Sequence, residues 1–469
     1  MSDNLFDILA RGIPDAAATA IETLSGERIS YGDLIARTGR MANALASLGV
    51  QPGDRVAAQV EKSVQAIILY LATVRAGAVF LPLNTGYTPA EIEYFVGDAA
   101  PAIFVCDPAK ADQLAPVAGN ARLLTLSADG QGSLTDAATS APEDFTTVPR
   151  VSDDLAALLY TSGTTGRSKG AMLTHGNLVS NTLALREAWE YTASDVLIHA
   201  LPIFHTHGLF VATNVTLFSG ASMIFLPKFD VDRIFEGMRL FISGSAPLLA
   251  DTHREWRART GHAILERYGM TETNMNASNP YRGDRVAGTV GMPLPGVEII
   301  VTDPETGAEL PKGEIGMIEV RGPNVFSGYW QMPEKTAAEL RENGFFITGD
   351  LGRFDERGYL HIVGRGKDLI ITGGYNVYPK EIETEIDALP GVTESAVIGL
   401  PHRDLGEGVT AVIVGSTPPS EAEVLAALED RLARFKLPKR VLFVDNLPRN
   451  TMGKVQKNLL RDQFRELYD

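Results

Sequence analysis

Apolar positions follow two different patterns along the first hundred residues. They recur every three or four positions in residues 31–48 and again in 63–77, as on one face of a helix. Short continuous apolar runs occur at 56–60, 78–81 and 102–105 and are typical of buried strands. Helices that alternate with buried strands predict a parallel sheet covered by helices.

The pattern changes after Val290, where short strand-like runs are separated by Gly and Pro turns. After Gly364, short strands alternate with predicted helices at 379–389 and 421–435. We therefore predict an α/β fold with a large N-terminal domain of helix-covered sheets plus a β-rich subdomain, and a small α+β C-terminal domain joined by a hinge. The predicted boundaries are 1–364 for the N-terminal domain, 365–368 for the hinge and 369–469 for the mobile C-terminal domain.

Length and charge narrow the classes of function. A chain of 469 residues exceeds one ordinary core, which predicts two to three structural units. The formal net charge of −16 gives no general attraction to nucleic acid or to an anionic membrane, so we expect neither as a partner. The single cysteine, Cys106, cannot form an internal disulfide, and the N-terminus lacks the features of a signal peptide. We expect a soluble cytoplasmic protein.

A loop rich in glycine and hydroxyl groups follows the apolar run 155–160. It reads Thr161-Ser-Gly-Thr-Thr-Gly-Arg-Ser-Lys-Gly and differs from the Walker pattern in its spacing. Glycines let backbone N–H groups approach phosphate oxygens, and Lys169 adds positive charge. From the residues alone, a nucleotide loop and a flexible turn remain equally open. The phosphate-binding candidates are Thr161, Ser162, Gly163, Thr164, Thr165 and Lys169.

This loop resembles the signature of the adenylate-forming superfamily, which includes acyl-CoA synthetases, the adenylation domains of peptide synthetases and firefly luciferase. Further matching segments follow in the family's order at 267–272, 348–350, 364–368, 373–379 and 448–454. The resemblance therefore covers nearly the whole chain.

The resemblance implies a site for ATP and Mg²⁺. Tyr268 would lie on the adenine, Thr271 would hold phosphate and Glu272 would bind Mg²⁺, which needs few protein ligands when phosphates also bind it. Asp350 would bind the ribose and Arg365 the ribose and α-phosphate. Alone, an Asp in such a segment is more often a turn residue. The other implied ATP contacts are Ser245, Ala246, Pro247 and Gly269.

Three further roles follow from the resemblance. Lys454, ordinarily a solvated lysine in such a loop, matches the family's catalytic lysine, whose ammonium would offset charge in the transition state. Lys367 lies at the hinge position. Gly373 and Gly374 would line the tunnel for CoA.

The candidate acyl pocket contains two histidines. No carboxylate or cysteine stands at ligand spacing from His205 and His207, so a metal site there is not expected. The resemblance to the family's matching motif implies that one of them orients the acyl carboxylate, and we expect this of His207. A dicarboxylic acid would also need a partner for its second charge, and Arg282, Arg285 and the histidines all remain open. The candidate pocket residues are His205, Thr206, His207, Met270 and Arg282.

Together these motifs predict an ATP-dependent acyl-CoA synthetase. The acid would attack the α-phosphate of ATP, and CoA would then displace AMP from the acyl-adenylate after the C-terminal domain rotates. The segments 270–276 and 288–296 most closely resemble malonyl-CoA synthetases, so malonate is the expected acid. The alternatives are a synthetase for another short acid, a carrier-loading module (for which no carrier domain is present), a light-emitting oxidase and a non-catalytic nucleotide-binding protein.

One departure from the family affects this expectation. Residues 229–236 begin a predicted helix, but Gly237 and Met238 lead directly into the predicted strand 239–244. The enzymes that the chain resembles carry an additional strand and helix between these points, with an arginine suited to a second carboxylate. A chain without this unit is expected to be less stable, to bind ATP weakly and to convert malonate poorly.

Overall fold

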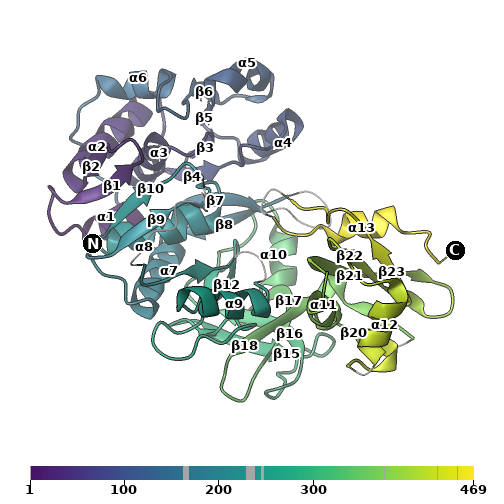
Figure 1. Ribbon diagram of the computed structural model, residues 1–469. Coiled ribbons are helices and arrows are strands. Elements are labelled where there is room, and N and C mark those ends of the chain that lie inside the picture. Colours follow the sequence, from purple (N-terminus) through teal and green to yellow (C-terminus); the bar gives the residue numbers. More distant parts are fainter. Residues whose placement is uncertain are drawn as a thin grey trace.

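The computed structural model describes residues 2–161, 168–228, 238–244, 248–373, 375–429, 431–450 and 453–468. Figure 1 shows a large body that contains the N-terminus and a smaller lobe at one side that contains the C-terminus. The predicted α/β class and this division into a large and a small part are confirmed. Within the described ranges, no helix combines the length and the apolar character needed to cross a membrane.

The first sheet of the large body has the strand order β6-β5-β3-β4-β7-β8. Its strands run parallel, except that β7 and β8 form an antiparallel pair. Their bounds are β3 Arg55–Gln59, β4 Val79–Pro82, β5 Ile103–Cys106, β6 Arg122–Thr125, β7 Leu155–Thr161 and β8 Lys169–Thr174. The helices of this region are α2 Tyr31–Ser47, α3 Val64–Arg75, α4 Pro89–Ala99, α5 Ala111–Leu114 and α6 Ser133–Thr139, with 3₁₀ turns at Pro108–Lys110 and Ala115–Val117.

The predicted early helices and strands are confirmed. Ser30 begins α2 with a capping box, in which its hydroxyl accepts from the backbone of Asp33 and the Asp33 carboxylate accepts from the backbone of Ser30. Helix α3 is buried along almost its whole length, from Ala66 to Arg75, because α1, α2 and β4 pack around it.

Two four-stranded sheets complete the centre of the large body. One has the order β2-β1-β10-β9 and the other β11-β12-β13-β14. The strands are β1 Thr19–Thr23, β2 Arg28–Ser30, β9 Val196–His199, β10 Ser222–Phe225, β11 Ile242–Ser243, β12 Leu265–Met270, β13 Asn274–Ser278 and β14 Met292–Pro293. The helices are α1 Leu5–Ala10, α7 His175–Ala188, a π-helix His207–Thr213, α8 Asn214–Phe218 and α9 Ala250–Thr260. Of the predicted strand 239–244, only Ile242–Ser243 pairs with a described neighbour.

The β-rich subdomain is an antiparallel sheet with the order β15-β16-β17-β18, accompanied by helix α10. These elements are β15 Glu298–Thr302, β16 Gly316–Arg321, α10 Pro333–Glu339, β17 Phe346–Phe354 and β18 Leu360–Arg365. A 3₁₀ turn, Gly366–Asp368, follows β18 where the hinge is predicted.

The C-terminal lobe has its own sheet and core. The order β20-β19-β22-β21, with β23 beside β22, supports the helices α11 to α13. The bounds are β19 Ile370–Thr372, β20 Tyr375–Val377, α11 Pro379–Asp387, β21 Glu394–His402, β22 Gly406–Val414, α12 Glu421–Glu429, a 3₁₀ turn Arg434–Lys436, β23 Arg440–Phe443 and α13 Lys457–Gln463. Helix α12 is shorter than predicted.

The centre of the large body has an unusual feature at β9 and β11. Among the described residues, β9 pairs only with β10, and β11 pairs only with β12. In sequence, β10 precedes the predicted deletion and β11 follows it.

Restoring the missing unit is expected to stabilise the chain. Insertion of a related enzyme's strand–helix segment between Glu236 and Met238 should raise the melting temperature by roughly 5 °C or more, because backbone groups at both edges would gain partners. Thermal denaturation followed by circular dichroism measures this change. A Gly-Ser insert of equal length is the control, and equal melting temperatures for the original and restored chains would contradict the prediction.

Candidate active site

Asp350 is the centre of a buried polar cluster. The Tyr268 hydroxyl donates to Asp350 Oδ2 at 2.6 Å, and the Arg365 guanidinium lies 2.8 Å from Oδ1. The Asp350 side chain is only 7% exposed. Its charge is the main reason that the pKa of Arg365 is raised, whereas burial is the first cause of the raised pKa of Tyr268. Three residues predicted to hold the nucleoside are thus in direct contact.

Glu272 and Lys169 belong to a second cluster around Tyr329. The Tyr329 hydroxyl lies 3.1 Å from Glu272 Oε1 and 2.6 Å from Glu339 Oε2, although it can donate to only one of them at a time. Lys169 forms an ion pair with Glu339 at 3.3 Å, and its ammonium lies 4.2 Å from the centre of the Tyr329 ring. Burial raises the pKa of Glu272. A bound cation would compensate this buried carboxylate, which fits the predicted Mg²⁺ ligand.

The two predicted histidines lie beside a buried arginine. His207 begins the π-helix, and its Nδ1 accepts a hydrogen bond from Arg267 Nη2. Burial lowers the pKa of His207 well below its ordinary value and that of His205 to about 4. A guanidinium cannot accept a hydrogen bond, so neutral His207 carries its proton on Nε2. That N–H is able to donate to an acyl carboxylate.

Arg267 is almost completely inaccessible to solvent, with 3% of its surface exposed. Gly244, just after β11, packs against it, because an added Cβ at Gly244 would lie 2.4 Å from Arg267 Cζ. Burial lowers the pKa of Arg267 to about 9, so it remains a cation at neutral pH.

Lys454 comes from the C-terminal lobe and faces these clusters. Lys454 has a solvent-exposed face. Burial by surrounding protein atoms is the first cause of its lowered pKa, and Arg365 acts in the same direction. Asp350 and Glu272 act to raise this pKa. The backbone loop is fixed by a hydrogen bond from the Lys454 N–H to Asn450 Oδ1 at 3.0 Å. The lobe therefore presents an ammonium to the site that the large body builds.

The predicted hinge residue Lys367 is exposed and lies in the 3₁₀ turn after β18. The next residue, Asp368, forms an ion pair with Arg461 of α13 at 2.7 Å. Contact with surrounding protein atoms is the first cause of the lowered pKa of Lys367, and Arg365 and Arg461 act in the same direction. This turn thus connects the Asp350 cluster to the C-terminal lobe.

The remaining predicted residues divide into two groups. Thr161 at the end of β7 pairs with Lys169 at the start of β8, and Lys169 belongs to the Tyr329 cluster. Met270 ends β12, Gly269 lies within it, Thr271 follows, and Thr206 is buried beside His205. Gly373 has a positive φ and donates its N–H to Leu405 O. The following predictions lie outside the described residues: Ser162, Gly163, Thr164, Thr165, Ser245, Ala246, Pro247 and Gly374.

Arg282 was expected in the acyl pocket, and the geometry corrects this expectation. Its side chain is 80% exposed and forms an ion pair with Glu190 on the surface. Arg285 is also engaged elsewhere, because its guanidinium donates to the carbonyl oxygens of Pro280, Tyr281 and Ala263. Neither can serve a buried carboxylate without leaving these partners.

The sequence prediction missed Arg267, Tyr329 and Glu339 as site residues. Arg267 directly precedes Tyr268 in the matching segment 267–272, and this position could have indicated a site residue. Nothing in the sequence near Tyr329 indicated that it would bridge Glu272 and Glu339, which come from separate segments of the chain.

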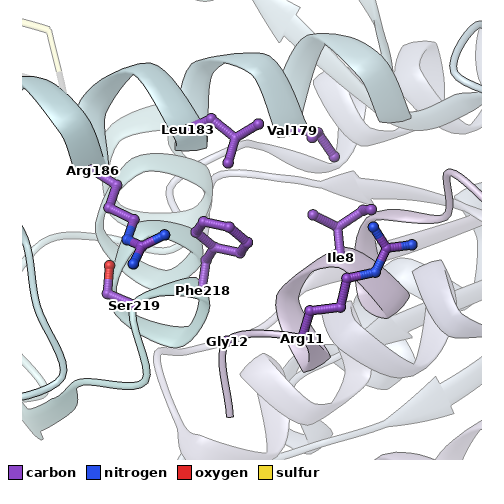
Figure 2. A pocket seen from close by; sticks show the side chains of 8 residues that line it. All are labelled: Ile8, Arg11, Gly12, Val179, Leu183, Arg186, Phe218 and Ser219. Atoms are coloured by element: carbon purple, nitrogen blue, oxygen red, sulfur yellow. The ribbon is translucent and has the colours of Figure 1, made fainter. Parts of the chain in front are cut away.

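No group of three or more metal-binding side chains of the His, Cys, Asp or Glu type occurs in the described part of the chain. A separate cavity of about 390 Å³ lies among α1, α7 and α8 and contains none of the predicted site residues (Figure 2). It is lined by Ile8, Arg11, Gly12, Val179, Leu183, Arg186, Phe218 and Ser219.

Comparisons with known proteins agree with the motifs. The family model "AMP-binding enzyme" matches residues 6–238 and 231–330, and the model "AMP-binding enzyme C-terminal domain" matches 381–454. The chain is 34% identical to "Malonate--CoA ligase" of Arabidopsis thaliana, over 90% of this chain and 80% of that protein. It is 36% identical to "Feruloyl-CoA synthase" of Amycolatopsis sp., over 95% of this chain and 96% of that protein.

A solved structure gives a higher identity. ATP-bound MatB from Rhodopseudomonas palustris is 63% identical, covers 100% of both chains and superimposes with a TM-score of 0.97. The apo form of MatB gives a TM-score of 0.86. The arrangement of this chain is therefore closer to the ATP-bound form.

The alignments also bear on the predicted deletion. The alignment with the Arabidopsis protein extends over 490 positions, more than the 469 residues of this chain, so that protein has residues that this chain lacks. The AMP-binding enzyme model is matched in two pieces that overlap at 231–238. This overlap falls at the position of the expected deletion.

Proposed function

The chain belongs to the AMP-binding enzyme family, and we propose that it is an ATP-dependent, AMP-forming acid–CoA ligase that converts malonate to malonyl-CoA. The observation that carries the proposal is the 63% identity and the TM-score of 0.97 with ATP-bound MatB over the full length of both chains. The two named relatives act on different acids by their names, so the choice of acid rests on MatB, the Arabidopsis ligase and the site itself.

In the first step, the acid carboxylate attacks the α-phosphate of ATP, which forms an acyl-adenylate and releases pyrophosphate. Tyr268, Asp350 and Arg365 would hold the nucleoside, and their mutual contacts support this role. Lys454 would donate to the oxygens on which negative charge accumulates, a contact that is worth most in the transition state. Its electrostatic interactions with Asp350, Glu272 and Arg365 support this placement.

Glu272 would hold Mg²⁺, with the triphosphate oxygens and water as the other ligands. When bound, Mg²⁺ neutralises phosphate charge and orients the leaving pyrophosphate. Lys169 can reach the same phosphates by exchanging its ion pair with Glu339 for one with ATP. His207 would orient the acid carboxylate through its Nε2–H.

In the second step, the CoA thiol attacks the acyl carbon and AMP leaves. We propose that residues 365–368 form the hinge between a 1–364 domain and a 369–469 domain, and that rotation about Lys367 replaces Lys454 with the surface around Gly373 and Gly374. Lys367 is exposed in a single 3₁₀ turn, which supports freedom to change its backbone angles. A cytoplasmic location remains a prediction of the sequence.

Arg267 is the proposed partner for the second carboxylate of malonate. It is a cation, it is buried beside His207, and Gly244 leaves no side chain between it and the adjoining space. A buried carboxylate requires such a partner, because an unpaired buried charge is costly, and a guanidinium can bind both of its oxygens. A monocarboxylic acid has no second carboxylate to make this contact.

A second candidate function is a catalytically impaired relative, and the two-piece family match at 231–238 favours it. The missing unit would leave one wall of the acyl pocket open. Malonate-dependent pyrophosphate release by the original and restored chains distinguishes an active ligase from an impaired relative. Only an impaired chain gains activity when the segment is restored.

Lys454→Ala is expected to slow adenylation by ~10²-fold or more and to leave thioester formation from preformed malonyl-AMP largely intact, because the ammonium serves the first step only. Pyrophosphate release and thioester formation are measured separately. Lys439→Ala, at an exposed lysine of the same lobe, is the control. Equal losses in both half-reactions would refute the assigned role.

Lys367→Pro is expected to reduce the thioester step more than adenylation, because proline fixes φ and opposes the rotation. The two half-reaction rates are compared with those of Lys367→Ala, which keeps the backbone free. Unchanged turnover in the proline variant would place the hinge elsewhere.

The acid preference is expected to be malonate first, then methylmalonate, with acetate and succinate poor and octanoate rejected. Arg267→Gln should remove the preference for malonate over acetate, with a loss of at least ~30-fold in kcat/KM for malonate. Pyrophosphate release across these acids measures it, and Arg282→Gln is the matched surface control. A preference for octanoate in the unmodified chain would overturn the malonate assignment, and an unaffected Arg267→Gln would overturn the role of Arg267.

A further inference from the structure

His199, the last residue of β9, is a buried histidine outside the clusters of the candidate site. Only 1% of its surface is exposed, and burial is the first cause that lowers its pKa to about 3, so the ring is neutral at pH 7. Its Nε2 lies 2.9 Å from the carbonyl oxygen of Gly208, which directly follows His207. A carbonyl oxygen only accepts, so Nε2 carries the ring proton and donates to Gly208, and Nδ1 is left as an acceptor.

Lys62 supplies the donor for this Nδ1 from the segment between β3 and α3. Its Nζ lies 2.9 Å from His199 Nδ1 and 2.6 Å from the His199 carbonyl oxygen. Burial lowers the pKa of Lys62 to about 7, and even a neutral amine has two N–H groups, one for each acceptor. The ring of Phe225 in β10 packs on both side chains, with its centre 4.5 Å from Nζ and 5.2 Å from the centre of the imidazole ring. Lys62 and His199 thus hold each other in one arrangement.

The hydrogen bond from His199 to Gly208 closes residues 199–208 into a loop. A second contact tightens the neck of this loop, because a Cβ added at Gly208 would lie 2.0 Å from the carbonyl oxygen of Pro202. Only glycine allows the two segments to approach so closely. Inside the loop lie three of the candidate pocket residues, His205, Thr206 and His207. The orientation of these side chains therefore depends on what holds the neck.

The π-helix His207–Thr213 begins at this neck, which makes the dependence stronger. A π-helical turn is rare, and it occurs frequently at functional sites. The Gly208 carbonyl in this turn receives two side-chain donors, the Nε2–H of His199 and the hydroxyl of Thr213 at 3.1 Å. Contacts thus lead from Lys62 through His199 to the first turn of this helix.

We propose that Lys62 is a positioning residue for acid binding, because through His199 it holds the 199–208 loop in the conformation that orients the His207 ring. Lys62 acts through the loop and not by contact with the acid. The inference rests on the proposed function only in the claim that His207 binds the acid carboxylate. Without the N–H groups of Lys62, Nδ1 and the carbonyl oxygen of His199 would lose these donors in a buried place. A loop that relaxes to recover partners for them moves the His207 ring.

Lys62→Met keeps the length of the side chain and removes its N–H groups. We expect kcat/KM for malonate to fall at least ~10-fold, mainly through a higher KM for malonate, because the loop contributes to binding of the acid. The KM for ATP and the rate of thioester formation from preformed malonyl-AMP should change less than about twofold, because the Asp350 and Tyr329 clusters lie outside this loop. Lys110→Met is the control, since Lys110 also donates to a backbone carbonyl, that of Thr85 at 2.6 Å. An unchanged KM for malonate, or equal losses in all three measurements, would overturn the proposal.

His199→Phe keeps a flat ring and removes both ring nitrogens, so it tests whether Lys62 acts through His199. By itself it should raise the KM for malonate about as much as Lys62→Met does. In the double variant the two losses should not multiply, and kcat/KM should stay within about twofold of the weaker single variant. Multiplied losses would show that Lys62 acts independently of His199 and would overturn the proposal.

The histidine ring signals in nuclear magnetic resonance give a readout that does not need ligase activity. With nitrogen-15-labelled histidine in the full chain, the signals of His199 and His207 are assigned by their loss in His199→Phe and His207→Asn. We expect the Nε2–H tautomer at His199, and Lys62→Met should shift the His207 signals while Lys110→Met leaves them in place. Absence of malonate activity in the unmodified chain would refute the proposed function, and the His207 signals would still decide this inference. Unchanged His207 signals in Lys62→Met would overturn it.

Discussion

The buried carboxylate of Asp350 is the constraint on which the rest of the candidate site depends. A charge with so little access to water needs partners, and it receives them from two different sheets, through Tyr268 of β12 and Arg365 at the end of β18. These contacts fix β12 relative to the β-rich subdomain. Because the 3₁₀ turn Gly366–Asp368 begins one residue after Arg365, the same ion pair also fixes the point from which the C-terminal lobe departs.

The two parts of the molecule contribute to the site in different ways. The large body holds its polar groups in short hydrogen bonds and ion pairs, as around Asp350 and Tyr329. In contrast, none of the hydrogen bonds and ion pairs between described residues joins 1–364 to 369–469. The position of Lys454 therefore depends on the packing of α11 against β18, on the turn 366–368 and on longer-range electrostatics, and not on hydrogen bonds between the two parts.

Local patterns in the sequence were sufficient for the early helices and strands, because α2 has its own cap and α3 its own apolar periodicity. Motifs also located Tyr268, Glu272 and Asp350, which the fold brings to neighbouring clusters. The cation for a second carboxylate could not be chosen from the sequence for a physical reason: whether a cation is buried depends on tertiary packing. Arg282 and Arg267 are the same type of residue, but Arg282 pairs with Glu190 at the surface and Arg267 packs against Gly244 in the interior.

Strand β11 and the acyl end of the site belong to one region of the large body. Gly244 directly follows β11 and packs against Arg267, whose guanidinium donates to His207. The predicted adenine-side loop at 245–247 follows directly after β11 in the sequence. A displacement of β11 would therefore act on acid selection and on the adenine side together, whereas the contacts of Asp350 and of Tyr329 are made by other strands. The residues for the chemistry and the residues that select the acid are thus held by different strands, so a change at β11 can alter the choice of acid while it leaves the Asp350 and Tyr329 clusters in place.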